Sequence, residues 1–231
     1  MTVAFPPAGP GLNGVDTESF VSLRLVGLGA SAGRALDGST ITVASNSAHW
    51  AAEVTYAISG EGALTWQGFL ANMQGAIGET LVPAWSRAVP LDGQFRPVVR
   101  FDPVYIGQYT PLADNTGVGF SPYTHAVLTS AAALRDTILN VTYVDAAPLR
   151  PGHRIGIQDR LHDVLWVTNL TSTTARIRVN PPMRQAYDAG ERVILDTPVC
   201  RMKFASPNEG IIPYRNVNYE RVTVRFMEAL P

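Results

Sequence analysis

The second half of the chain constrains the fold most, because short segments of alternating apolar and polar residues follow one another there. In one of them Ile177 and Val179 alternate with Arg176 and Arg178, the period of a strand that buries one face. Short strands spaced 8–12 residues apart are typical of a small β-barrel or sandwich. The predicted strands are 124–130, 137–144, 153–158, 163–170, 174–180, 191–196 and 198–205.

The first half combines strands with a single helix. Strands are predicted at 17–26, from Ile41 to Val43, at 50–58, at 79–85 and at 95–101. Between them an apolar stripe with helical spacing (i, i+3, i+4, i+7, i+11) is formed by Trp66, Phe69, Leu70, Met73 and Ile77. Gly75 and Gly78 are stop signals for this helix. One apolar stripe among strands predicts a helix that lies on a sheet.

Two segments are predicted to be loops. The first is Gly27–Gly38, whose glycines at 27, 29 and 33 resemble a dinucleotide loop. Their spacing is one residue too long, and the turn pair Asp37-Gly38 follows where the motif needs a helix, so we expect no nucleotide site. The second is the Pro- and Gly-containing stretch 102–122, a long irregular loop of the kind that often carries function.

The last predicted strand, 221–228, suggests how the domains are connected. Its residues Val222, Val224 and Phe226 form an apolar face that needs a partner. The predicted barrel already contains about six short strands, near the usual number for a sheet, and has little room for another. We therefore expect the last strand to pair with the first strand, Val21–Leu25. The predicted fold class is mainly β: a β-sandwich, ring-forming domain with one amphipathic helix (1–123 and 207–231) and an inserted small β-barrel (124–206).

Composition limits the classes of partner. Charged residues make up 16% of the chain, against roughly 25% in average proteins, which predicts a surface partly covered by other subunits. The net charge of −1 provides no strong field toward nucleic acid or anionic membrane. Cys200 is the only cysteine, which excludes an intrachain disulfide. With neither a secretory signal nor an apolar stretch of about 20 residues, we expect a soluble protein made in the cytoplasm.

Residues of the types that bind metals occur close together at only one place in the sequence, which contains His153, Asp159, His162 and Asp163. A metal site needs three or four converging ligands, and this spacing matches no known ligand motif. We interpret Asp159 to Asp163 as the polar turn of a hairpin, with His162 exposed. No metal and no organic cofactor is expected.

Catalytic motifs are not recognised in the sequence. It has no G-x-S-x-G elbow, no H-E-x-x-H helix and no P-loop. Cys200 alternates with Met202 and Phe204 on a predicted buried face, where a thiol is an inert small apolar group. Acidic residues are scattered singly, so no pair is nominated for glycoside hydrolysis. We expect a protein that is not an enzyme and has no catalytic residues.

The four tryptophans raise the alternative of a sugar-binding platform. Trp50 opens a strand, Trp66 lies on the helix stripe and Trp166 sits among apolar residues, so we expect Trp66 and Trp166 in the core. Trp85, beside Pro83 and Ser86, is the interface candidate. A carbohydrate-binding module would use the 102–122 loop with Tyr105, Tyr109 and Tyr123.

Three groups of segments resemble the distal and minor tail proteins of long, non-contractile-tailed phages. The first is Trp50–Tyr56, followed by the helix 66–75, which is similar to their tryptophan strand and F-L-x-x-x-x-G helix. The second is 149–157 with 164–167, similar to their L-x-P-G-D-x-I-x-I and L-Y-x-V hairpin, with His153 in place of Asp and Trp166 in place of Tyr. The third is 175–202, similar to their P-P-L-R, A-G-x-x-V and P-x-x-x-M run.

The resemblance implies a structural virion protein without catalytic residues. It implies a distal tail protein that forms a ring, expected to be a hexamer, between the tail tube and the tail tip or baseplate. Its partners would be itself, the tube protein and the tip or hub proteins, with DNA passing through the lumen but no specific nucleic-acid binding and no membrane. It would be assembled in the host cytoplasm. The alternatives are a tube terminator or hub subunit, the carbohydrate-binding module, and, third, a hydrolase.

Overall fold

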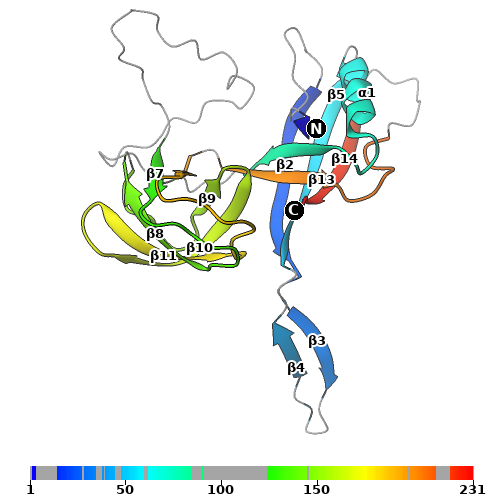
Figure 1. Ribbon diagram of the computed structural model, residues 1–231. Coiled ribbons are helices and arrows are strands. Elements are labelled where there is room, and N and C mark those ends of the chain that lie inside the picture. The colour runs from blue at the N-terminus through cyan, green and yellow to red at the C-terminus, as the bar shows by residue number, and fades with distance from the viewer. Residues whose placement is uncertain are drawn as a thin grey trace, which may run out of the picture. The chain divides into compact units, whose positions relative to one another are not determined.

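A computed structural model gives the fold of most of the chain (Figure 1). The residues it describes are 2–3, 15–27, 29–34, 38, 40–44, 48–59, 62–84, 90, 124–144, 146–196, 198–211 and 219–230. The chain divides into two compact units, Met1–Leu81 with Arg201–Leu230, and Val82–Cys200. We call them the sheet unit and the barrel unit. The expected fold class is confirmed: the protein is mainly β and contains an inserted small barrel.

The sheet unit is built on a six-stranded sheet with the order β1-β6-β13-β14-β5-β2. In β5 every second residue from Trp50 to Ile58 is buried, and in β14 the same holds from Val222 to Phe226. These alternations place one apolar face on the same side of the sheet, as expected for strands with one buried face. The strands are Thr2–Val3 (β1), Val15–Val26 (β2), His49–Ser59 (β5), Glu79–Pro83 (β6), Val199–Phe204 (β13) and Tyr219–Glu228 (β14).

The helix α1, Gly62–Met73, supplies the aromatic centre of this core. The ring of Trp66 lies 4.8 Å from that of Tyr56 in β5 and 5.4 Å from that of Phe69, measured between centroids. Phe69 meets Phe204 of β13 edge-on at 5.9 Å. The Trp66 Nε1–H donates to the carbonyl of Gly210 at 2.8 Å, so its polar atom is satisfied although it is fully buried. The predicted stripe therefore packs on the sheet.

The stripe ends one turn earlier than the sequence predicted. Gln74 and Gly75 have positive φ values of 46° and 68°, which ends the helix after Met73. The amide of Gly78 donates to the Met73 carbonyl at 2.8 Å, and a Cβ at position 78 would lie 2.6 Å from the Met73 Cα. Glycine is therefore required there. Ile77 lies beyond the end and is 80% exposed, so its expected place on the buried stripe was wrong.

The segment predicted as a glycine-rich loop contains a strand. Residues Gly29–Arg34 form β3, which pairs antiparallel with Thr40–Ala44 (β4) in a two-stranded sheet of its own. The register shifts between Ser31 and Gly33, where Gly33 has a φ of 108°. The small residues of β3 gave no alternating apolar signal, and its pairing depends on backbone hydrogen bonds, which is why the sequence missed it.

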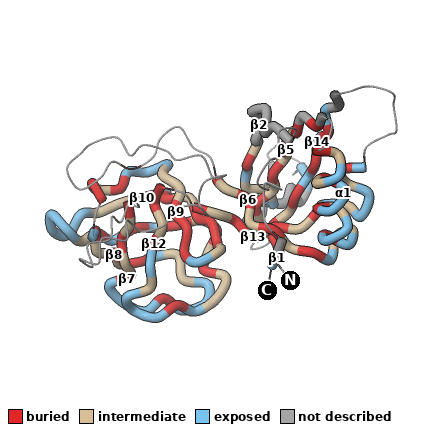
Figure 2. The backbone as a smooth tube through the Cα atoms, turned by 90° about the horizontal axis from the view of Figure 1, so that it is seen from above, coloured by how far each residue is buried: buried red, intermediate tan, exposed pale blue. Residues whose placement is uncertain are grey.

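The barrel unit is a closed barrel of six strands in the order β10-β11-β8-β7-β12-β9. Its interior holds one apolar cluster that includes Leu128, Val141, Ile155, Ile177 and Val193, all buried (Figure 2). The strands are His125–Leu128 (β7), Ile138–Tyr143 (β8), Arg154–Ile157 (β9), Arg160–Asn169 (β10), Thr174–Asn180 (β11) and Arg192–Ile194 (β12). Six of the seven predicted segments of this region are barrel strands.

The seventh segment, 198–205, belongs to the other sheet. It forms β13, which pairs with β14 through Met202–Glu228 and Phe204–Phe226. The chain leaves the six-stranded sheet along β6 and returns along β13, and these strands are neighbours. Just past the sheet, the amide of Ala84 donates to the carbonyl of Pro198 at 2.8 Å, so the two connections run together.

The expected pairing of the first and last long strands was also wrong. β5 lies between them: β14 pairs with β5 through Val224–Val54, and β2 pairs with the other side of β5 through Leu23–Ala52. Their apolar faces matched because all three strands cover the same core. Matching faces show that strands share a sheet but do not identify which are adjacent.

Candidate functional site

The residues considered as metal ligands are held in separate local contacts. The Arg150 amide donates to the Nδ1 of His153 at 3.1 Å. Asp163 accepts from the Nε of Arg154 at 3.4 Å. Burial lowers the pKa of His153, with Arg150 acting in the same direction, and burial raises the pKa of Asp163 against the effect of Arg154. Within the described ranges, no three His, Cys, Asp or Glu residues are grouped to hold a metal.

His162 is buried, which contradicts its expected exposure. The β9–β10 hairpin turns at Gln158 and Asp159, and the register pairs Ile157 with Arg160, so His162 lies two residues inside β10. Its Nδ1 is 2.7 Å from the carbonyl oxygen of Pro181. The polar composition of the segment correctly indicated a hairpin, but the turn comes earlier than we expected.

A polar cluster surrounds Tyr187 beside this turn. Arg160 is buried, and its Nε lies 3.6 Å from the Oδ1 of Asp159. Burial raises the pKa of Tyr187 to about 12, an effect that Arg160 opposes and Asp159 and Glu191 reinforce. The Tyr187 hydroxyl therefore stays neutral at physiological pH and donates to the Ile157 carbonyl at 3.5 Å. At neutral pH the hydroxyl serves there as a hydrogen-bond donor and not as a general base.

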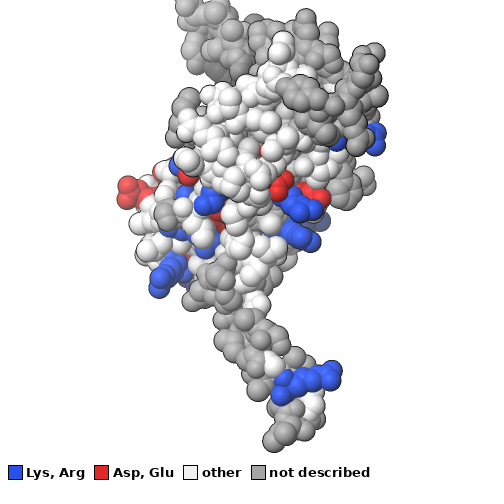
Figure 3. Space-filling model, turned by 90° about the vertical axis from the view of Figure 1, so that its right-hand side faces the viewer, with Lys and Arg blue, Asp and Glu red and all other residues white. Residues whose placement is uncertain are grey.

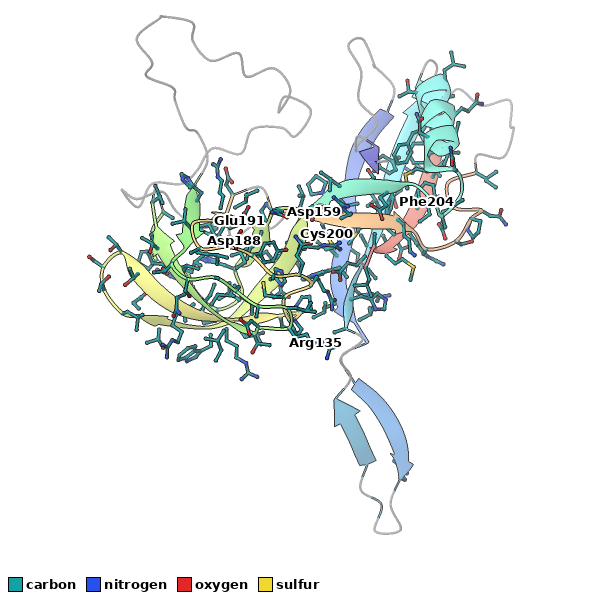
Figure 4. The ribbon with its side chains drawn as sticks, viewed as in Figure 1. Arg135, Asp159, Asp188, Glu191, Cys200 and Phe204 are labelled. Atoms are coloured by element: carbon teal, nitrogen blue, oxygen red, sulfur yellow. The ribbon has the colours of Figure 1, made fainter. Side chains whose placement is uncertain are left out.

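Cys200 occupies the position expected of it. It is fully buried and alternates with Met202 and Phe204 along β13 (Figure 4). Met202 and Phe204 are buried as well, so Cys200 fills a core position of the strand.

Trp166 lies on the outside of the barrel, so the prediction that it belongs to the core was wrong. It is 46% exposed, and the neighbouring Leu165 is 50% exposed. A β-bulge explains the reversal: Val164 pairs with Val179 and Trp166 with Arg178, which leaves Leu165 as an extra residue. Beyond the bulge the alternation changes phase, and Val167 packs against the core in the place that Trp166 would have taken.

The bulge creates a mixed apolar and basic surface on three neighbouring strands, which we call the Trp166 face. Across β10, β11 and β8 the register aligns Trp166 with Arg178 and Arg178 with Ile138. The next outward row along the strands is Thr168, Arg176 and Asn140. Side chains at such directly opposed positions are about 5 Å apart at Cβ, so each row is a continuous surface.

The second distinctive surface is the edge of the six-stranded sheet. β2 is 12 residues long, and in the described part of the chain β5 is its only strand partner. The opposite edge is β1, a two-residue strand that pairs parallel with β6. A long edge strand presents backbone N–H and C=O groups that another strand can pair with. The two ends of the sheet therefore differ greatly in what they offer to a partner.

Several predicted features lie outside the described residues. These are Trp85, the strand at 95–101, the loop 102–122 and its tyrosines Tyr105, Tyr109 and Tyr123. The carbohydrate-binding interpretation relied on that loop and stays a prediction. On the face drawn in Figure 3, the described surface is largely uncharged, in agreement with the low charged fraction of the sequence.

Comparisons with known proteins complete this description. None of the helices in the described ranges is both long and apolar enough to cross a membrane. No protein-family model matches the chain, and no curated protein sequence matches it.

Proposed function

We propose that the chain is a structural subunit of a non-contractile phage tail, the distal tail protein, which self-associates into a hexameric ring between the tail tube and the tail tip. The observation that carries the proposal is the architecture: a sheet in which, within the described residues, the long strand β2 stands at one end, and a closed barrel inserted between two neighbouring strands of that sheet. The segments that resemble tail proteins lie in both units, which supports assigning the whole chain to this role.

The asymmetry of the sheet favours a ring over a simple pair. An interface that joins the β2 edge of one copy to the β1–β6 edge of the next is head-to-tail, because the two edges are unlike. Head-to-tail contacts close into rings when the rotation between copies is suitable. Closure would pair every long edge and remove the aggregation hazard of an unprotected strand.

The surface composition supports a role in assembly rather than catalysis. A charged fraction of 16% leaves large uncharged areas suited to burial between subunits. Two of the titratable groups weighed as ligands have local partners: Asp163 pairs with Arg154, and the Nδ1 of His162 lies 2.7 Å from the Pro181 carbonyl oxygen. In the same proposal the protein is assembled in the host cytoplasm and resides at the tail tip, with the tube and tip proteins as its neighbours.

The proposal is tested by the mass of the purified protein across a concentration series, with negative-stain images of the same samples. We expect the mass to rise toward that of a hexamer and rings to appear in the images. A strict monomer at the highest concentration, together with an absence of rings in assembled particles, would refute the proposed function.

A pair of adjacent substitutions tests the edge directly. Successive N–H groups of a strand point in opposite directions, so of Arg24→Pro and Leu25→Pro one removes an N–H that faces β5 and the other an N–H that faces away. The first should lower the melting temperature. The second should leave it nearly unchanged and abolish self-association. If the variant that keeps its melting temperature still forms rings, β2 is not the interface.

A further inference from the structure

We propose that the Trp166 face binds an acidic protein segment, with an apolar side chain of that segment packed on Trp166. The face is part of the barrel unit and is separate from the β2 edge used in the proposed ring. The inference therefore does not rest on the tail function and can fail or succeed independently of it.

Three large apolar side chains are exposed on or beside this face. Trp166 and Leu165 are displaced outward by the bulge, and Ile138, at 54% exposure, lies across from Arg178 in the same row. The core of the barrel is already filled without them, since Val167 takes the inward position. Trp residues flanked by other apolar groups are enriched at the energetic centres of protein interfaces.

The charges of the face are of one sign. Arg176 and Arg178 are exposed, and the outward positions aligned with them are Trp166, Ile138, Thr168 and Asn140, none of them acidic. The Nε of Arg176 donates to the Oδ1 of Asn140 at 3.3 Å, which orients the guanidinium on the face. Two rows that carry two arginines and no carboxylate attract an acidic partner and repel a basic one.

The carboxylates nearest to the two rows already have partners. Asp163 lies opposite Asn180 in the next outward row of β10 and β11 and is in an ion pair with Arg154. Asp136, two residues before Ile138, accepts from the Ala133 amide at 2.7 Å. Asp159 and Glu191 act on Tyr187 at the other end of the barrel, and Figure 4 shows Asp188 and Glu191 well apart from Arg135, which lies in the turn before β8. The positive character of the face therefore persists although the whole protein has a net charge of −1.

Protein fits this chemistry better than single-stranded nucleic acid does. Nucleic-acid platforms stack successive bases on several aromatic rings and follow the phosphates with a basic track. The Trp166 face has one aromatic ring, and the other large apolar groups are the aliphatic Ile138 and Leu165, on which bases do not stack. Aliphatic side chains beside arginines are suited to a peptide that carries leucine and glutamate.

The probe is a fluorescently labelled twelve-residue peptide of three Leu-Ser-Glu-Ser repeats, in which every second side chain points the same way when extended. Two control peptides replace Glu with Lys or Leu with Ser. Binding to the full chain is followed by fluorescence anisotropy. We expect saturable binding of the Leu/Glu peptide and much weaker binding of both controls. No saturable binding of the Leu/Glu peptide at millimolar concentration would overturn the proposal.

Two variants locate the binding. Trp166→Ala and Arg178→Glu should each weaken the Leu/Glu peptide about tenfold or more, because one removes the apolar anchor and the other places a like charge against the glutamates. Arg225→Glu is the matched control: it makes the same change of charge at an exposed strand position of the sheet unit and should have little effect. Melting curves confirm that each variant is folded.

The same variants separate the competing outcomes. Equal weakening by Arg178→Glu and Arg225→Glu would show that only overall charge matters and would overturn the assignment to this face. A thymidine oligonucleotide is measured in parallel. If the oligonucleotide binds more tightly than the peptide and Trp166→Ala abolishes its binding, the face is a nucleic-acid site and the protein proposal is wrong.

Discussion

The two units differ in how the edges of their strands are paired. In the barrel every strand has a neighbour on both sides, since β9 closes the circle by pairing with β10 and β12. In the six-stranded sheet the long strand β2 is left at one end with β5 as its strand partner in the described residues. A closed barrel leaves no strand edge, whereas the backbone groups of an edge strand are able to pair with another strand. Under the proposed function, assembly through strand edges is therefore expected of the sheet unit.

The two units also differ in which side chains fill their cores. The barrel is filled mainly by aliphatic side chains from its own strands, and its cluster is contiguous. The sheet unit depends on a helix whose aromatic rings link β5, β13 and β14 through Tyr56, Trp66, Phe69, Phe204 and Phe226. Because the two clusters consist of different side chains, each from its own unit, we expect the units to unfold separately. The following experiments test that expectation, from the largest effect to the smallest.

Removing the barrel tests the separation most severely. Ala84 and Pro198 are joined by a hydrogen bond of 2.8 Å, so a short Gly/Ser linker between them can replace the barrel without straining β6 or β13. We expect calorimetry of this variant to show one transition, that of the sheet unit, with the second transition lost. An unfolded product would show that the sheet unit requires the barrel and that the comparison is wrong.

Trp66→Ala should destabilise the sheet unit alone. The substitution removes a fully buried ring from the aromatic core and leaves the Gly210 carbonyl without its 2.8 Å hydrogen bond, at a cost of about 3–5 kcal/mol. Leu64→Ala is the control on the same helix, since Leu64 is 71% exposed. Denaturant unfolding should show the loss in one transition only. Equal losses in both transitions would mean that the units unfold together.

Ile177→Val should weaken the barrel by a smaller amount. One methyl group is removed from a fully buried position in β11, which typically costs about 0.5–1.5 kcal/mol. Trp166→Ala removes a far larger side chain but from an exposed position, and it should change stability by less than about 0.5 kcal/mol. A larger loss for Trp166→Ala than for Ile177→Val would contradict the outward placement of the tryptophan.

The smallest expected effect is on acid stability. Burial lowers the pKa of His153 below its ordinary value of 6.5, so the unfolded chain binds more protons than the folded one as the pH falls through that value. The free energy of unfolding therefore decreases as the pH is lowered through this window. His153→Asn keeps an acceptor for the Arg150 amide and should make the decrease shallower. An unchanged slope in pH-dependent melts would exclude His153 as a contributor.

How much of this was readable from the sequence depends on whether the signal was local. The strand containing Ile177 and the helix containing Trp66 were predicted because alternation and helical spacing are properties of neighbouring residues. The sheet to which β13 belongs was not predicted, because the alternation of Cys200, Met202 and Phe204 would be the same in either sheet. Which strand pairs with which is decided by the distant partner, and nothing in β13 itself specifies it.

The candidate surface was missed for a related reason. Trp166 was predicted to lie in the core because its neighbours Val164, Leu165 and Val167 are apolar, and only the pairing of β10 with β11 reveals the extra residue. The turn at Gln158 and Asp159 shifted His162 from an expected turn into a buried strand in the same way. Errors of one or two residues leave the fold prediction intact, yet they reverse the prediction of which side chains reach a partner.

The bulge at Leu165 also determines how the barrel's outer chemistry is able to change over time. Loss of that single residue would restore regular alternation and leave Trp166 opposite Arg178 and Val167 opposite Ile177, so the outer surface would lose only a leucine. A regular strand that kept Leu165 would instead pair it with Arg178 and turn Trp166 inward, opposite Ile177. The outward place of the tryptophan therefore depends on the irregular pairing at Leu165, and homologous barrels that pair this strand regularly at the same length would carry a different outer surface.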